Sequence, residues 1–305
     1  MPPPPSPFTL RTGIYPEIDP ARLGGALACQ TALVTGSGRG IGREMALALA
    51  QAGANVVVTG RTPKEVDATT KEINALEGTH GTAYGIVANV LDRTDLQRLV
   101  DESLGKLGGA IDILVCNAGS NLFQPFHLTD ATEWWDLMEL NVRAPVELTR
   151  LVLPSMRARN KGTLIYTSSR AATADLPWTT AYNCAKTAIT RFAGTLQAEV
   201  DQLPALEDKT PDVANAIRCY SIHPGEIETS LHDTAFPQRT KDKAPYVIEH
   251  MAKIGAHRPH YEGVLPAWTV VWLCVPSEAR EALKGKYVDC TRDVVEQSKA
   301  VAGKL

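Results

Sequence analysis

The sequence predicts an α/β fold, a doubly wound parallel β-sheet in a single domain, from two observations. First, six short runs of apolar and β-branched residues recur along the chain, and segments of helical length separate them. Second, the segment after the first run carries apolar side chains at helical spacing. Apolar strands that alternate with helices are typical of a parallel sheet covered on both faces. The predicted strands are residues 31–35, 55–59, 83–87, 111–115, 163–167 and 218–222.

The first predicted helix has one apolar face. Right-handed crossovers between parallel strands pack such helices onto the sheet and set the binding site at the carboxyl ends of the strands. We expect one catalytic domain over residues 29–305. The apolar face of the first helix consists of Ile41, Met45, Ala48, Leu49 and Ala52.

The first 28 residues differ from the rest of the chain. They are rich in proline and show no periodicity. We therefore expect residues 1–28 to form an irregular extension that is flexible or lies along the surface. An arm that binds a partner is the alternative.

Composition and charge exclude several classes of protein. With 44% hydrophobic and 21% charged residues, the chain can bury a sizeable core. The net charge of −3 provides no basic field for nucleic acid or an anionic membrane. The six cysteines form no CxxC pair and have no histidine at zinc-finger spacing, so we expect reduced thiols and no metal site. No stretch approaches the roughly 20 apolar residues of a membrane span, and we expect a cytoplasmic protein.

A glycine-rich turn joins the first predicted strand to the first predicted helix. Gly36, Gly40 and Gly42 let the backbone turn tightly and approach a pyrophosphate, whose charge the helix N-terminus favours. Glycines also make ordinary turns, but a position between an apolar strand and an amphipathic helix favours nucleotide binding.

The spacing of these glycines, TGxxxGxG, resembles the turn of the short-chain dehydrogenase/reductase family. Further motifs of that family follow in its order along the chain. The resemblance implies a Rossmann-type fold and a nicotinamide dinucleotide cofactor. The motifs are Asn117-Ala118-Gly119, Asn141, Ser169, Tyr182-x-x-x-Lys186 and Pro224-Gly225-x-Ile227-x-Thr229.

The end of the second predicted strand favours NADP(H) over NAD(H). An NAD site needs a carboxylate here for the ribose hydroxyls, but Gly60 stands at that position and Arg61 follows it. Arg39 is a second cation beside the turn, and guanidinium groups bind phosphate through paired donors. The alternative is that both arginines are solvated surface residues. We expect NADP(H), with its 2′-phosphate held by Arg39 and Arg61.

The resemblance implies further cofactor contacts. The family has Asp-Val at the adenine where this chain has Asn89-Val90, and an asparagine can still accept a hydrogen bond from the adenine amino group. Residues 224–229 would anchor the nicotinamide carboxamide. The expected cofactor-binding residues are Gly36, Arg39, Gly40, Ile41, Gly42, Arg61, Asn89, Val90, Asn117, Ala118, Gly119, Tyr182, Lys186, Pro224, Gly225, Ile227 and Thr229.

The expected acid–base residue is Tyr182, which would share a helix face with Lys186 four residues later. A neighbouring ammonium, together with the charge of oxidised nicotinamide, would lower the pKa of the phenol from about 10. Tyr182 would donate a proton to the developing alkoxide or remove it in the oxidative direction. The resemblance implies that Lys186 also holds the nicotinamide ribose. Ser169 has the family's spacing from Tyr182 and would orient the substrate oxygen, with Ser168 as the alternative.

Asn141 is the fourth expected catalytic residue. It lies in a helix of apolar periodicity, and the resemblance implies that it holds a water in a proton relay to the lysine. Pro145 has no N–H to donate to the carbonyl of Asn141, so that carbonyl should be free to bind the water. A satisfied structural asparagine is the alternative. We therefore expect an irregular helix at residue 141.

Three segments should wall the substrate pocket: residues 120–122, residues 176–178 and a lid over about 230–264. Residues 201–216 are polar, and we expect a surface insertion there. The apolar or aromatic side chains of the lid could equally be simple packing residues. The lid carries Phe236, Tyr246, Met251 and His257.

The expected function is that of an NADP(H)-dependent oxidoreductase acting on CH–OH groups. It would be a carbonyl reductase or secondary alcohol dehydrogenase for a small organic ketone or alcohol. The alternatives are a redox-neutral biosynthetic enzyme on the same scaffold and a non-catalytic NADP(H)-binding protein. We expect no nucleic-acid or membrane partner, and the resemblance implies a homodimer or homotetramer.

Overall fold

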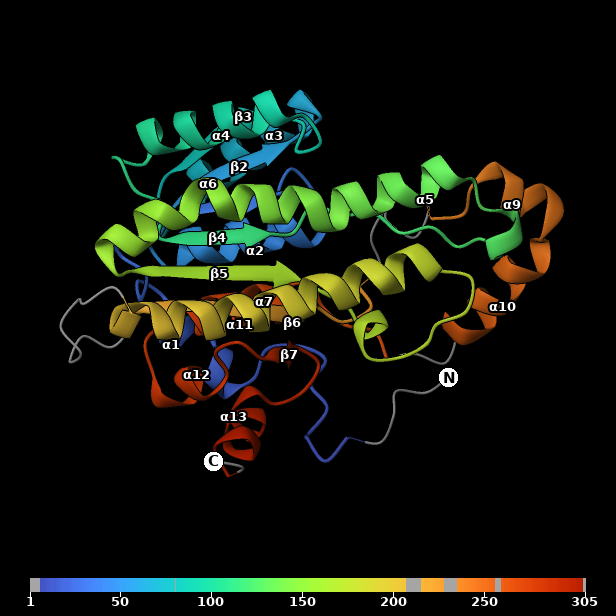
Figure 1. Ribbon diagram of the computed structural model, residues 1–305. Helices are drawn as coiled ribbons and strands as arrows, with labels where there is room; N and C mark the ends of the chain where they lie inside the picture. The colour runs from blue at the N-terminus through green and yellow to red at the C-terminus, as the bar shows by residue number, and fades with distance from the viewer. Residues whose placement is uncertain (1–5, 80, 207–214, 228–234, 256–258, 304–305) are drawn as a thin grey trace.

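Seven strands form one parallel sheet in the computed structural model, which describes residues 6–79, 81–206, 215–227, 235–255 and 259–303. The strand order is β3-β2-β1-β4-β5-β6-β7, and every neighbouring pair is parallel (Figure 1). This confirms the predicted doubly wound α/β fold. The strands are β1 Thr31–Thr35, β2 Asn55–Gly60, β3 Ala83–Val87, β4 Ile113–Cys116, β5 Gly162–Thr167, β6 Ile217–His223 and β7 Tyr287–Asp289.

Six of these strands coincide with the apolar runs predicted from the sequence, with ends displaced by two residues at most. The strand that was not predicted is β7, at the edge of the sheet beside β6. Its three residues are too short a run to show periodicity, and only pairing with β6 makes them a strand.

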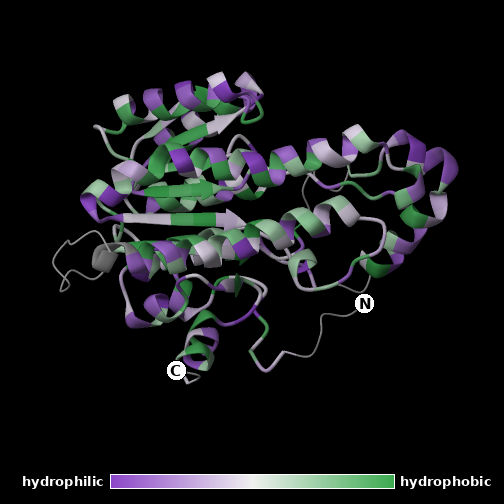
Figure 2. Ribbon diagram, viewed as in Figure 1, coloured by the Kyte–Doolittle hydropathy of each residue, from purple (hydrophilic) through white to green (hydrophobic). Residues whose placement is uncertain are grey.

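Successive residues of the central strands face opposite sides of the sheet. Ala32 and Val34 of β1 belong to a core cluster with α2 and α11, whereas Leu33 belongs to a second cluster with α4, α6 and α7. The central strands are largely hydrophobic along their length, while α4 alternates between hydrophobic and hydrophilic residues (Figure 2). The helices are α2 Gly40–Gln51, α3 Pro63–Ala75, α4 Arg93–Lys106, α6 Ala144–Arg159, α7 Thr180–Leu206 and α11 Val264–Cys274.

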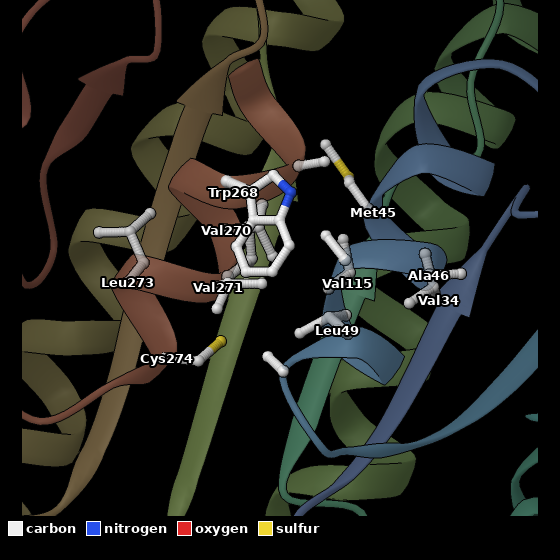
Figure 3. Close-up of a cluster of buried hydrophobic side chains, with 14 of the residues drawn as sticks. Val34, Met45, Ala46, Leu49, Val115, Trp268, Val270, Val271, Leu273 and Cys274 are labelled. Carbon is white, nitrogen blue, oxygen red and sulfur yellow. The ribbon is translucent and has the colours of Figure 1, made fainter. Parts of the chain in front are cut away.

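Helix α11 packs against α2 over the first face of the sheet (Figure 3). Met45 and Leu49 of α2 meet Trp268 and Val271 of α11, and all four side chains are buried. Burying a large apolar side chain contributes about 1.5–3 kcal/mol, so this contact is a main source of stability. Residues 265–274 are buried on all sides of the helix, because further chain covers its outer surface.

That covering chain is the N-terminal segment, which lies along the outer surface of α11 and also buries some of its apolar side chains there. The segment forms η1 Pro16–Ile18 and α1 Pro20–Leu23, and both contact α11. Tyr15, Ile18 and Leu27 are buried, and the Tyr15 hydroxyl accepts a hydrogen bond from the Val294 amide at 3.2 Å. Composition indicated an irregular segment, but its few apolar side chains are spaced so that each reaches the core.

The remaining helices lie at the two ends of the strands. The helices α5 Ala131–Met138, α9 Gln238–Lys243 and α10 Pro245–Gly255 lie beyond the arrowheads of β4 and β5 (Figure 1), so part of the expected lid is helical. Helix α7 continues to Leu206, so the start of the expected insertion at 201–216 is helical, and residues 207–214 lie outside the described part. The C-terminal helices are α12 Glu278–Ala282 and α13 Val294–Ala302.

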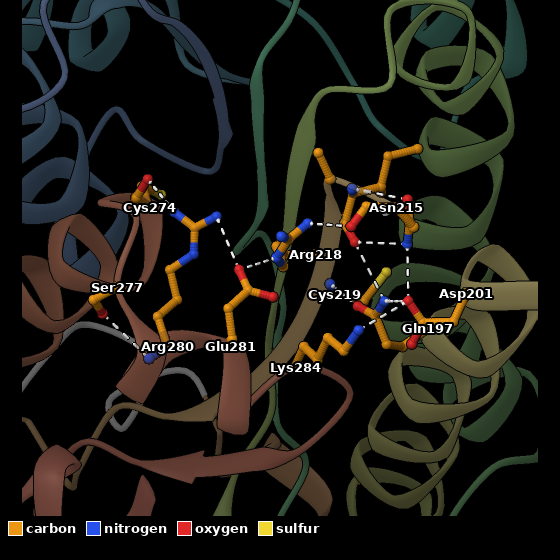
Figure 4. Close-up of polar contacts among 12 residues, drawn as sticks. Gln197, Asp201, Asn215, Arg218, Cys219, Cys274, Ser277, Arg280, Glu281 and Lys284 are labelled. Carbon is orange, nitrogen blue, oxygen red and sulfur yellow. Dashed lines mark hydrogen bonds and ion pairs between the residues drawn. The ribbon is translucent and has the colours of Figure 1, made fainter. Parts of the chain in front are cut away.

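A polar network closes the other end of the sheet, where β6 begins (Figure 4). Arg218 of β6 forms an ion pair with Glu281 of α12, and Lys284 pairs with Asp201 of α7 at 3.1 Å. These contacts tie α7 and α12 to β6, far along the strand from its carboxyl end. Among the residues placed in the structure, no helix is both long and apolar enough to cross a membrane.

Candidate active site

The carboxyl ends of β1 and β4 lie side by side, because the chain changes direction in the sheet there. The strands β2 and β3 extend the sheet on one side of β1, and β4 to β7 extend it on the other. In such sheets ligands bind in the crevice outside the strand ends. A narrow cavity lies at this place, and its lining residues are Thr35, Val90, Ala118, Leu140, Ala144, Pro145 and Leu148.

The glycine-rich turn between β1 and α2 has a backbone that only glycine adopts easily. Gly36 has φ +65° and Gly40 has φ +58°, both in the left-handed region. A Cβ at Gly42 would overlap the side chain of Asn117 and the carbonyl of Gly36. Helix α2 begins at Gly40, so its free N–H groups point out of the turn. The turn therefore has the geometry of an anion cradle.

Two hydroxyl side chains to which the sequence analysis assigned no role, those of Thr35 and Ser37, brace this turn. The Thr35 hydroxyl accepts hydrogen bonds from the amides of Asn117 and Ala118 at 3.0 and 3.1 Å. The Ser37 hydroxyl is fully buried, donates to the carbonyl of Val34 at 2.6 Å and accepts from the Thr59 amide at 2.9 Å. These hydroxyls join β1 to β4 and to β2 at the site. Their polarity beside strands of apolar residues was the available signal.

Asn117 ties its own motif to the glycine turn. Its side-chain amide donates to the carbonyls of Thr35 and Gly36 at 3.1 and 3.3 Å. The loop after β4 and the loop after β1 are thus one unit. The structure brings these two predicted motifs together.

The two predicted phosphate-binding arginines lie at the outer end of this unit. Arg39 forms an ion pair with Glu65 at 3.2 Å, and its side chain is 59% exposed. Arg61 is exposed, and no hydrogen bond or ion pair joins it to the residues that the structure describes. The side-chain oxygen of Asn89 accepts a hydrogen bond from the Leu91 amide at 3.2 Å.

Tyr182, Lys186 and Ser169 meet where β5 ends. Tyr182 and Lys186 lie one turn apart on α7, with the Lys186 ammonium 5.3 Å from the centre of the tyrosine ring. The ammonium donates to the carbonyl of Thr167 at 2.7 Å, and the Ser169 hydroxyl lies near enough to that of Tyr182 to influence its pKa. Ser168 turns the other way, with its hydroxyl 2.5 Å from that of Thr190. Ser169 is therefore the serine that faces the tyrosine.

Burial dominates the pKa values of this group. It raises the pKa of Tyr182 to about 12, although the hydrogen bond with Ser169 opposes the rise. Burial also lowers the pKa of Lys186 to about 8, since the ammonium loses water. The expected lowering of the pKa of Tyr182 depends also on the charge of oxidised nicotinamide, and it stays a prediction. Both shifts favour the uncharged forms, so the acid–base pair needs a further positive charge to titrate lower.

The helix is irregular at Asn141, as predicted. Residues Glu139–Arg143 form a π-helical turn between α5 and α6, and the amide of Ala144 donates to the carbonyl of Glu139, five residues back. Pro145 lacks the N–H that a regular helix would aim at Asn141. The Asn141 side-chain amide donates to the carbonyls of Ser120 and Leu137, while its buried oxygen has no hydrogen-bond partner among the described residues.

Gly119 opens space between this oxygen and the lysine. A Cβ at Gly119 would lie 2.7 Å from the Asn141 oxygen and 3.6 Å from the Lys186 ammonium. The absence of a side chain therefore leaves both polar atoms facing one small volume.

The loop after β6 also lies at the carboxyl ends of the strands. Gly225 has φ +97°, and a Cβ there would lie 3.1 Å from Thr291 and 3.3 Å from the ring of Tyr261. Pro224, Gly225 and Ile227 follow β6, which pairs with the β5 strand that precedes Ser169, while Thr229 lies outside the described residues.

Aromatic side chains gather over the carboxyl ends of the strands. Phe123 stacks on Phe236 with ring centres 5.2 Å apart, and Trp178 meets Tyr246 and His250 edge to face at 6.3 and 4.8 Å. Trp178 has φ +62°, a strained backbone for a bulky residue. The 120–128 loop, Trp178 and the α9–α10 pair thus form one apolar wall. Residues 228–234 and 256–258, including His257, lie outside the described part.

A dinucleotide cradle beside a serine, a tyrosine and a lysine defines a nicotinamide-dependent class of oxidoreductase. The family model for short chain dehydrogenases matches residues 30–240 of the chain. The protein therefore belongs to the short-chain dehydrogenase/reductase family.

Relatives agree with this assignment. A short chain dehydrogenase of Pseudocercospora fijiensis is 32% identical, over 92% of this chain and 86% of its own length. The human dehydrogenase/reductase SDR family member 4 is 35% identical, over 75% of this chain and 77% of its own. A 7α-hydroxysteroid dehydrogenase, solved with NADH and 7-oxo glycochenodeoxycholic acid, superposes with a TM-score of 0.71 at 26% identity and covers 91% of this chain and 97% of its own.

Proposed function

We propose that this protein is an NADP(H)-dependent carbonyl reductase or secondary alcohol dehydrogenase that acts on a small organic ketone or alcohol. One observation carries the proposal: Tyr182 lies beside Ser169 and one helical turn from Lys186, at the carboxyl ends of the strands, where the glycine turn also lies. An acid–base phenol beside a hydroxyl that can hold the substrate oxygen is what carbonyl reduction requires.

The residues present fit a nicotinamide dinucleotide. The left-handed backbones of Gly36 and Gly40 shape the turn, and the missing side chain of Gly42 lets the helix start lie against Asn117 and the Gly36 carbonyl. The side-chain oxygen of Asn141 is a buried acceptor with no hydrogen-bond partner among the described residues. When bound, the cofactor supplies or accepts the hydride, and its oxidised ring carries the positive charge that lowers the pKa of Tyr182.

The chain's own residues then perform the proton chemistry. Ser169 donates to the substrate oxygen and fixes its place. Tyr182 donates its proton to the developing alkoxide in reduction and removes it in oxidation. Lys186 keeps one N–H on Thr167 and directs the others toward ribose hydroxyls. Asn141 would hold a water that passes the proton on to Lys186.

Charge supports the choice of NADP(H). Arg61 is exposed at the end of β2, where Gly60 leaves no carboxylate to repel a 2′-phosphate. Arg39 lies across the glycine turn and would exchange its exposed pairing with Glu65 for the phosphate. NADP(H) pools are kept reduced in cells, which favours the reductase direction.

The proposal also includes the compartment, the type of partner and the oligomeric state of the enzyme. All six cysteines are free thiols, which fits the reducing cytoplasm. The partner is a small-molecule substrate, and the family resemblance supports a homodimer or homotetramer.

The test is NADPH oxidation against ketones of graded size. The wild type should consume NADPH and ketone in equal amounts, and Tyr182→Phe should lower kcat about 10²-fold or more with NADPH affinity preserved. Product formed without NADPH consumption would identify the redox-neutral alternative. NADPH binding with no ketone turned over would leave only a binding protein.

A further inference from the structure

An ion pair joins the two strand ends that carry the catalytic serine and the loop after β6. The strands β5 and β6 are parallel neighbours, with Thr167 opposite Ile222, and the Ser168 amide still donates to the carbonyl of Ile222 at 2.7 Å. Arg170 and Glu226 each stand three residues beyond the last residue of their strand. The sheet register therefore places these two residues side by side.

Arg170 and Glu226 form an ion pair at this position. The Arg170 guanidinium donates to the Glu226 carboxylate, and the two side chains are only 15% and 19% exposed. The backbone amide of Arg170 also donates to the imidazole Nδ1 of His223 at 3.3 Å. An ion pair so far removed from water is stronger and more rigid than one on the open surface.

The arginine is coupled directly to the catalytic serine. Ser169 caps the short helix η4 Arg170–Ala172, and its hydroxyl accepts from the Ala171 amide at 3.2 Å beside Tyr182. A shift of Arg170 therefore moves the peptide that carries Ser169.

The glutamate is coupled to the loop after β6. It follows Gly225, whose left-handed backbone lies against the ring of Tyr261 and the methyl of Thr291. Those two side chains block movement of the loop on one side. On its other side, the loop is held by the ion pair with Arg170.

We propose that Arg170 and Glu226 are positioning residues that set the distance between Ser169 and the 224–227 backbone. This inference rests on the proposed function, in which Ser169 holds the substrate oxygen and the 224–227 loop anchors the nicotinamide. Hydride transfer requires the ring carbon and the carbonyl carbon to be aligned, and a displacement of about 1 Å costs on the order of 10²-fold in rate. The glycine turn binds the rest of the dinucleotide, so the pair governs alignment more than affinity.

The test compares Glu226→Gln and Arg170→Met with the reversed pair, Arg170→Glu combined with Glu226→Arg. A matched control is Glu281→Gln, which breaks the partly buried ion pair with Arg218 at the opposite end of β6. Single-turnover reduction is followed with NADPH and with NADPH deuterated at the transferred position. Binding of NADP is measured separately by calorimetry.

We expect Glu226→Gln to slow hydride transfer about 10-fold to 100-fold, with NADP affinity within about two-fold of wild type. The isotope effect on kcat should rise as hydride transfer becomes rate-limiting, and the reversed pair should recover part of the rate. The control Glu281→Gln should change only thermal stability. Wild-type kcat and isotope effect in Glu226→Gln, with a change confined to stability, would overturn the proposal.

A second readout separates this proposal from the proposed function. Transferred nuclear Overhauser effects report the orientation of the nicotinamide ring of bound NADP, whether or not a ketone is reduced. We expect one ring orientation in the wild type and a mixture in Glu226→Gln. If the wild type binds NADP but reduces no ketone, the proposed function fails while this comparison still decides the role of the pair. An unchanged ring orientation in Glu226→Gln, or no NADP binding by the wild type, overturns the positioning role.

Discussion

The substitution Gly42→Ala should damage the cofactor cradle through a single methyl group. The added Cβ would overlap the Asn117 side chain and the Gly36 carbonyl, and it would lie 2.9 Å from the carbonyl carbon of Gly36. Neither neighbour is the loose end of a flexible side chain. The Asn117 amide is held by carbonyls at 3.1 and 3.3 Å, so the methyl group forces those hydrogen bonds to break or the turn to open.

The size of the effect follows from these contacts. Overpacking in a tight site costs about 1–3 kcal/mol, and each lost hydrogen bond costs about 1 kcal/mol. The free energy of unfolding should therefore fall by about 2–5 kcal/mol, which lowers the urea midpoint by about 1 M. NADPH affinity should fall at least about ten-fold. A loss of about 1.4 kcal/mol in binding free energy, caused by strain in the turn, already has that effect.

Urea unfolding and NADPH titration of the same preparation measure both quantities. The control is Gly105→Ala, also within a helix, where an added Cβ meets nothing within 4 Å. This control should gain about 0.5–1 kcal/mol of stability with unchanged NADPH binding. If Gly42→Ala has the midpoint and the NADPH affinity of the wild type, the steric reasoning about the turn is refuted.

Three further predictions concern the arginine, the lysine and the N-terminal segment. Arg61→Asp should lower kcat/KM with NADPH about 10-fold to 100-fold relative to NADH, since a charge-assisted contact contributes about 1.5–3 kcal/mol; an unchanged NADPH-to-NADH ratio would remove Arg61 from the phosphate site. Burial lowers the pKa of Lys186 to about 8 from 10.5, so between these values the unfolded chain holds more protons and the wild type should gain stability as pH rises from 8 to 10.5. Urea unfolding at several pH values should show this gain relative to Lys186→Met, and parallel pH profiles would contradict it. Tyr15→Ala should lower the free energy of unfolding by about 3–5 kcal/mol because the ring is buried. The control Ile14→Ala removes an exposed side chain and should change the stability little. Equal urea midpoints for the two variants would show that the N-terminal segment does not pack against the core.

Much of the fold could be predicted because its strands are short apolar runs separated by segments of helical length. The runs at 31–35 and 83–87 coincide with β1 and β3 residue for residue. The N-terminal segment could not be predicted in the same way. Its composition is that of a loose chain, and only the position of α11 shows that Tyr15 and Ile18 have an apolar surface to cover.

The candidate site likewise has a part that the sequence predicted and a part that only the structure shows. Motif spacing predicted Asn141, Ser169 and Tyr182, and Pro145 predicted the break in helical hydrogen bonding that the π-helical turn displays. Motifs are read within one stretch of chain, so they carry no information on the hydrogen bonds of Thr35 with the loop after β4 or on the pairing of Arg170 with Glu226. These contacts join residues that are distant in sequence and depend on the order of the strands.

The amino-acid sequence by itself determined the alternation of strands and helices and the glycine turn, and it supplied the proposed acid–base residues, because these depend on local side-chain chemistry and spacing. The tertiary structure alone decided the burial of each group. Burial raises the pKa of Tyr182 and lowers that of Lys186, since the field of a charge depends on the water that surrounds it. How much water remains near each group is a property of the packed chain, which no local pattern records.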